Sequence, residues 1–145
     1  MRFYKFIFFT VFFFIATQSF AQARVSQIFT KNDNFFITNK IGYDIGGTYF
    51  FEGKVPPIAE LSENGTGMIQ SEDLSKKNIV WGIQCSKSGT PKVKKGFDSA
   101  KYTFWYKDKN DGDDKWIEGH FSIHFKIKKM FVLGNRSKTY IDKKY

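Results

Sequence analysis

The sequence contains a single cysteine, Cys85, among its 145 residues. One cysteine cannot form an intramolecular disulfide, so the folded chain must be held together by the burial of apolar side chains. We interpret Cys85 as a small buried residue rather than as a nucleophile or an intermolecular bridge. Catalytic motifs are missing as well, because the chain has no G-x-S-x-G, no H-E-x-x-H and no phosphate-binding P-loop. The sequence therefore gives no support for an enzyme, and we expect no catalytic residue, no cofactor and no metal.

Long apolar runs are missing from most of the chain, and the one that exists lies at the N-terminus. Eight of the 18 phenylalanines fall in the first twenty residues, after a basic start formed by Arg2 and Lys5. A polar stretch with small residues follows, which is the order of a secretory signal peptide. The apolar run is shorter than the roughly 20 residues that a permanent membrane anchor needs. We predict a signal peptide over residues 1–23, cleaved after Ala23 or, as an alternative, after Ala21.

Acidic residues are in the minority, with 14 Asp and Glu against 23 Lys and Arg and a net charge of +9. Loss of Arg2 and Lys5 with the signal peptide leaves one domain over residues 24–145 with a net charge of +7. We expect this domain to be secreted, to an extracellular or periplasmic location. A basic domain favours an anionic partner such as a phospholipid headgroup, an acidic glycan or a nucleic acid, and export makes nucleic acid the least expected.

Helical periodicity is missing from residues 24–145, where apolar and polar side chains mostly alternate. Ile79, Trp81, Ile83 and Cys85 follow the period of two that is typical of a strand with one buried face. We predict strands over the ranges Val25–Thr30, Phe35–Thr38, Thr48–Phe51, Gly67–Ser71, Ile79–Cys85, Tyr102–Lys107, Trp116–Lys128 and Lys129–Leu133. Short strands separated by turn residues predict an all-β fold, a single antiparallel β-sandwich.

The predicted strand Trp116–Lys128 has one apolar and one basic face. Its buried face would carry Phe121, Ile123, Phe125 and Ile127. Its exposed face would carry His120, Ser122, His124, Lys126 and Lys128. Four residues of a strand span about 13 Å, so His120 and His124 cannot share a metal ion, and we interpret them as outward polar residues.

An acidic segment lies just before this strand. Asp108, Asp111, Asp113 and Asp114 offer enough oxygen atoms for Ca²⁺, but their spacing does not fit an EF-hand loop. The lysines between them repel a cation, and Asp-Gly is typical of a turn. We interpret the segment as the solvated tip of a hairpin, with a Ca²⁺ site as the alternative.

Aromatic and basic side chains flank this hairpin, and they form our candidate ligand site. Its members are Trp105, Tyr106, Trp116, Lys107, Lys109 and Lys115. The rings would stack on a ligand or anchor in a membrane interface, and the lysines would contact an anionic group. Further lysines cluster elsewhere, at Lys92, Lys94 and Lys95, at Lys126, Lys128 and Lys129, and at Lys138, Lys143 and Lys144. The alternative for all of them is that they keep an exported domain soluble.

One stretch resembles the middle of the small cytolysins of the aegerolysin-like and actinoporin-like families. The residues concerned are Gly53 to Ile58 with Pro56-Pro57, Gly65 to Glu72, and Ile79 to Gln84, about 35 residues of the chain. The resemblance implies a β-sandwich and contact with lipid. The chain departs from these families because the Trp-Pro-Tyr type of segment late in their sequences is replaced by Phe104-Trp105-Tyr106 without a proline. An N-terminal amphipathic helix is also absent, which disfavours pore formation by helix insertion.

Two hypotheses follow from these patterns. The first is a secreted β-sandwich that binds a membrane lipid or a glycan through aromatic and basic loop residues. The second is a protein-interaction module, an inhibitor or immunity protein, that binds an acidic protein partner. A hydrolase would require a pocket with convergent polar groups, which the sequence alone does not reveal.

Overall fold

The computed structural model describes residues 24–51, 58–112 and 115–140. Several predictions concern residues outside these ranges: the signal peptide over 1–23, Pro56-Pro57, Asp113 and Asp114, and the tail residues Lys143 and Lys144. Across the described ranges, no helix is long and apolar enough to cross a membrane.

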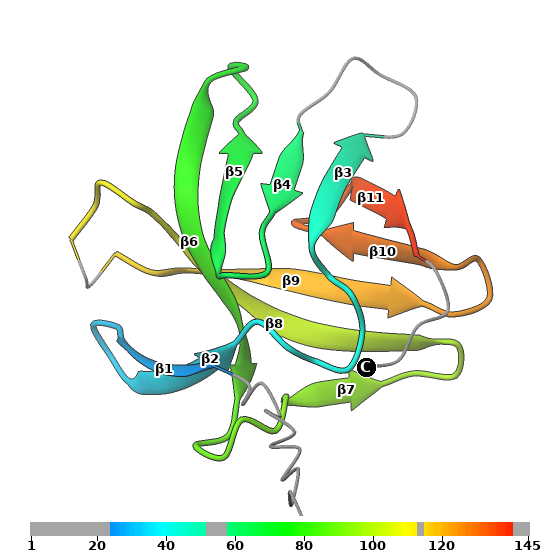
Figure 1. The fold of residues 1–145 in the computed structure, drawn as a ribbon, viewed down its shortest axis with the longest axis horizontal. Helices are drawn as coiled ribbons and strands as arrows, with labels where there is room; N and C mark the ends of the chain where they lie inside the picture. The colour runs from blue at the N-terminus through cyan, green and yellow to red at the C-terminus, as the bar shows by residue number, and fades with distance from the viewer. Residues whose placement is uncertain (1–23, 52–57, 113–114, 141–145) are drawn as a thin grey trace, which may run out of the picture.

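The described part of the chain is built from β-strands whose pairings are all antiparallel (Figure 1). In chain order they are β1 (Val25–Phe29), β2 (Asn34–Thr38), β3 (Gly47–Phe51), β4 (Ala59–Leu61), β5 (Thr66–Gln70), β6 (Lys76–Cys85), β7 (Val93–Lys95), β8 (Ser99–Asp108), β9 (Ile117–His124), β10 (Lys129–Val132) and β11 (Arg136–Thr139). The prediction of an all-β, antiparallel fold is confirmed.

Eight of these strands close into a barrel. Strands β3, β4, β5 and β6 pair in sequence, β6 pairs with β8, and β8 to β11 continue the series until β11 pairs with β3. We expected a sandwich of two sheets, but the hydrogen bonding runs continuously around this up-and-down barrel. The hairpin β1–β2 joins the C-terminal part of β6, and β7 joins the start of β8, so both extend the sheet outside the barrel.

The inside of the barrel is filled by side chains. Trp81, Phe104, Tyr49 and Phe121 are each at most 1% exposed, and the Trp81 and Phe104 rings stack with centroids 5.7 Å apart. An eight-stranded barrel is just wide enough for side chains to fill it. The packed interior is therefore a hydrophobic core, which leaves the outer surface for ligand binding.

A second apolar cluster lies outside the barrel, under the β1–β2 hairpin. Ile28 and Ile37 of that hairpin pack with Trp105 of β8, and all three are at most 6% exposed. Gly82 makes the close approach possible, because a Cβ atom at this position would lie 2.7 Å from Cδ1 of Ile37. Gly82 lies on the face of β6 opposite to Trp81 and Ile83, and the structure shows that a second layer covers that face.

The predicted strand Trp116–Lys128 is wrong in its last four residues. Strand β9 ends at His124, and Phe125 to Lys128 form the turn into β10, where Lys128 has φ +53°. Phe121 and Ile123 are buried as predicted, but Phe125 and Ile127 are 36% and 55% exposed. The period of two continued through the turn by coincidence, so alternation alone could not locate the end of the strand.

Three short strands were not predicted: β7 and β11 have few apolar residues, and β4 has only three residues, too few for alternation to show. In β11, Arg136 and Lys138 pair with the buried residues Val132 and Met130 of β10. Their stems therefore start on the core side, while the Lys138 ammonium reaches the carbonyl oxygen of Asp44 at 2.9 Å. Burial lowers the pKa of Lys138, although Asp44 partly opposes this. Long basic side chains can thus occupy inward positions by extending their charged ends out of the core.

Candidate functional site

The structure brings two rings of the predicted ligand site, Trp105 and Trp116, together in one cluster, but largely as packing. Trp105 is only 6% exposed, stacks on Phe35 with centroids 4.8 Å apart, and donates from Nε1 to Oε1 of Gln84 at 3.3 Å. Trp116 is half-buried against the same cluster, with the Lys107 ammonium 5.3 Å from its ring centroid. Trp105 therefore presents no free ring face to a ligand, whereas the Trp116–Lys107 pair remains at the surface.

Tyr106 lies on the other side of the sheet from Trp105, because neighbouring residues of a strand point to opposite faces. Its ring packs against the core residue Phe104 with centroids 5.8 Å apart. Burial raises the pKa of Tyr106, and the nearby Arg136 guanidinium partly offsets that effect. Trp105 and Tyr106 therefore cannot serve one surface site together.

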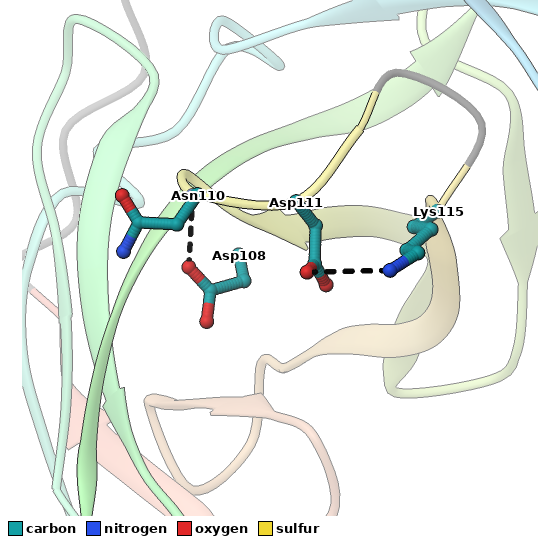
Figure 2. A network of polar contacts seen from close by, with 4 residues as sticks. All are labelled: Asp108, Asn110, Asp111 and Lys115. Atoms are coloured by element: carbon teal, nitrogen blue, oxygen red, sulfur yellow. Dashed lines mark hydrogen bonds and ion pairs between the residues drawn. The ribbon is translucent and has the colours of Figure 1, made fainter.

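The acidic hairpin between β8 and β9 is a solvated turn in the part that the structure describes. Figure 2 shows Asp108 accepting a hydrogen bond from the backbone N–H of Asn110 at 3.0 Å, and Asp111 paired with Lys115 at 3.6 Å. Lys109 is exposed there, and its backbone N–H bonds to the carbonyl of Asn78. No three metal-ligating side chains group together among the described residues. Ligand binding by Lys107, Lys109, Lys115 and Trp116 stays a prediction.

The clearest concave surface lies elsewhere, on the outer face of β7, β8, β9 and β10. It is an open groove of about 760 Å³. Its polar lining comprises Lys94, Lys101, Thr103, His120, Ser122 and His124, together with Lys92. Val93 and Phe131 add apolar walls, and no described side chain that lines it is acidic. We call this surface the basic groove.

Strand register places the groove residues in two rows. Lys94 lies opposite Lys101, and Lys101 lies opposite Ser122, so three neighbouring strands contribute to one row. Thr103 lies opposite His120 in the next row. The His124 side chain is held by Ser122, whose Oγ is 3.2 Å from Nε2. The prediction that His120 and His124 face outward on one strand is confirmed.

Two turns lie side by side at the end of β8 and β9 that is remote from the acidic hairpin, on the right of Figure 1. They are residues 96–98, between β7 and β8, and residues 125–128, between β9 and β10; we call them the apical turns. A hydrogen bond from the backbone N–H of Phe125 to the carbonyl of Asp98, 2.9 Å long, joins them. Both turns begin at strand ends that also line the basic groove, so the two surfaces are continuous.

Large apolar side chains are exposed on the apical turns. Phe97 is 102% exposed, and Ile127 is 55% exposed. Phe97 starts a two-residue loop that is closed by the hydrogen bond from Gly96 to the carbonyl of Ser99 at 2.7 Å. A tight, hydrogen-bonded hairpin thus carries a phenyl ring in water.

The positive charge of the domain is concentrated at the same end. Residues 92–101 and 120–129 contain seven lysines, and Asp98 is their one acidic residue. These segments supply +6 of the +7 expected for residues 24–145. The sequence showed both lysine clusters, but only the pairing of β8 with β9 shows that they lie at one end.

No protein-family model matches the chain, and no curated protein or solved structure matches it either. Sequence reasoning missed Phe97 and assigned Ile127 to the core; the signal for Phe97 was an apolar residue between Gly96 and Asp98, directly after the cluster Lys94-Lys95.

Proposed function

We propose that this protein is exported and binds the surface of membranes that contain anionic phospholipid, with the apical turns at the interface. The observation that carries the proposal is the fully exposed Phe97 ring at the end of the molecule that holds most of the net positive charge. Export is part of the proposal and rests on the signal-peptide pattern of residues 1–23.

The apolar component of binding would come from Phe97 and Ile127. Fully burying a side chain of this size contributes about 1.5–3 kcal/mol. While they are exposed to water, these side chains gain none of this free energy. Clustered exposed apolar side chains with a polar rim are typical of interaction sites. The acyl–headgroup boundary offers an apolar environment within reach of the tip of a hairpin.

The electrostatic component would come from the lysines around the turns. A basic residue close to an anionic membrane contributes about 1 kcal/mol. Lys95 directly precedes one turn, Lys126 lies within the other, and both side chains are exposed. Their long apolar stems can lie along the interface while the ammonium groups contact phosphate or carboxylate groups. Apolar side chains and lysines occur together on the apical turns. This combination favours a bilayer over an acidic glycan, because a glycan presents no apolar layer.

Flotation of the mature chain, residues 24–145, with vesicles tests the proposal. We expect binding to vesicles that mix phosphatidylserine with phosphatidylcholine and little binding to phosphatidylcholine alone. Binding should weaken from low to physiological salt, because the Debye length falls from about 30 Å at 0.01 M to about 8 Å at 0.15 M.

Equal binding to both kinds of vesicle, or binding to neither, would contradict the proposal. A sulfated polysaccharide column run in parallel covers the glycan alternative. Retention there without vesicle binding would move the function to an acidic glycan. Capture of an acidic protein from the native secretome without vesicle binding would instead favour the protein-interaction module.

A further inference from the structure

We propose that the basic groove is a binding site for a phosphate monoester carried on a small polyol, such as the glycerol phosphate headgroup of phosphatidic acid or its soluble counterpart. In the lipid case this inference rests on the proposed membrane function, and it assigns the chemical group that the surface next to the apical turns recognises. The groove is distinct from those turns in chemistry, because hydroxyl, imidazole and ammonium groups line it.

The strongest observation is a like-charge pair in register. Lys94 of β7 and Lys101 of β8 are directly opposite each other across neighbouring strands. Like charges at opposed positions of a sheet destabilise the pair. An anion between the two ammonium groups reverses that effect, and a local arrangement that costs stability is typical of a functional site.

The groove has more hydrogen-bond donors than one carboxylate can accept hydrogen bonds from. Lys94 and Lys101 each carry three N–H donors, and the hydroxyl groups of Thr103 and Ser122 lie on the same face. The dianionic phosphate monoester has three terminal oxygens, each able to accept more than one hydrogen bond, and such charge-assisted bonds are the strong ones. A phosphate between the two rows is therefore the best-matched anion.

The groove is also larger than a phosphate ion. Its volume of about 760 Å³ is in the range of sites for small organic ligands. Val93 and Phe131 form apolar walls beside the polar rows, and His124 packs edge-on against the Phe131 ring with centroids 5.0 Å apart. These walls suit the carbon skeleton of a glycerol or sugar that carries the phosphate.

The test uses the mature chain and the probe glycerol 3-phosphate, followed by amide NMR shifts and by thermal unfolding at constant ionic strength. We expect saturable shifts at Lys101, Ser122 and His120, and a higher melting temperature than in matched sodium chloride. Lys101→Gln should weaken binding about tenfold, since one charge-assisted contact is lost. The same variant should melt no lower than the wild type without ligand, because the like-charge pair is removed.

Lys76→Gln is the matched control, since Lys76 is an exposed lysine on β6 that does not line the groove. This variant should bind glycerol 3-phosphate as the wild type does. Equal weakening by both substitutions, shifts that never saturate, or no shift in the groove would overturn the proposal, because the lysines would then act only as diffuse charge.

A second experiment, with vesicles, identifies the source of the phosphate. Vesicles with phosphatidic acid should bind more protein than vesicles with the same amount of phosphatidylglycerol, a phosphodiester, and Lys101→Gln should remove this preference. Binding of glycerol 3-phosphate with no vesicle binding would support the groove with a soluble ligand and would count against the membrane function. Vesicle binding without any response to glycerol 3-phosphate or to headgroup type would retain the membrane function and overturn the groove.

Discussion

A chain with Phe97→Ser and Ile127→Ser is expected to bind vesicles of phosphatidylserine and phosphatidylcholine roughly 100-fold more weakly than the wild type. Full burial of each side chain contributes about 1.5–3 kcal/mol, so the loss of both at the lower end of this range, about 3 kcal/mol, weakens binding by a factor of roughly 100. Both residues are exposed on turns, so folding should be unaffected. Titration with vesicles, with circular dichroism as the check on folding, gives the partition coefficients.

The matched control is Phe29→Ser with Phe50→Ser. These phenylalanines are 54% and 59% exposed, but they lie on β1 and β3 rather than on the apical turns. The control variant loses a similar apolar surface and should bind vesicles as the wild type does. If it lost binding to the same extent, general surface hydrophobicity rather than the apical turns would be responsible.

Trp81→Ala is expected to have the largest effect on stability, lowering the free energy of unfolding by about 3–5 kcal/mol. Trp81 is 1% exposed, stacks on Phe104 inside the barrel, and donates from Nε1 to the carbonyl of Thr66 at 2.7 Å. The substitution leaves a cavity and removes one of the two hydrogen bonds that the Thr66 carbonyl accepts, in a domain without a disulfide. Since small domains have a total stability of about 5–15 kcal/mol, a large share would be lost.

Urea unfolding followed by circular dichroism measures this loss, with Trp116→Ala as the comparison. Trp116 is half-buried in the cluster outside the barrel, so its removal should cost far less. Equal costs for the two tryptophans, or a Trp81→Ala chain as stable as the wild type, would show that the barrel interior is not the principal core.

The sequence allowed the strand content to be predicted wherever one face is buried, as in Ile79, Trp81, Ile83 and Cys85, all of which are at most 2% exposed. It could not reveal the closure of the barrel, because that depends on pairings such as β3 with β11, far apart in the chain. It also could not show which tryptophans are covered. Trp105 lies on the outward face of β8, and the β1–β2 hairpin, which packs over Gly82, covers it together with Trp116.

The candidate site was less predictable than the fold for a related reason. The predicted residues Lys107, Lys109 and Lys115 belong to the end of β8 and β9 opposite the apical turns. Local sequence put rings beside lysines there, and the ring of Trp105 proved to be part of a core. The apical turns combine residues from positions 96–98 and 125–128, which only long-range pairing brings together.

The most direct test of the account is to measure which end of the barrel touches the membrane. Isotope-labelled mature chain bound to anionic nanodiscs that contain doxyl-labelled phospholipid reports the proximity of each amide to the acyl chains. The account predicts the strongest broadening at residues 96–98 and 125–128 and little at residues 108–112. Strongest broadening at residues 108–112 and Lys115 would instead support the acidic hairpin as the contact and would contradict the assignment to the apical turns.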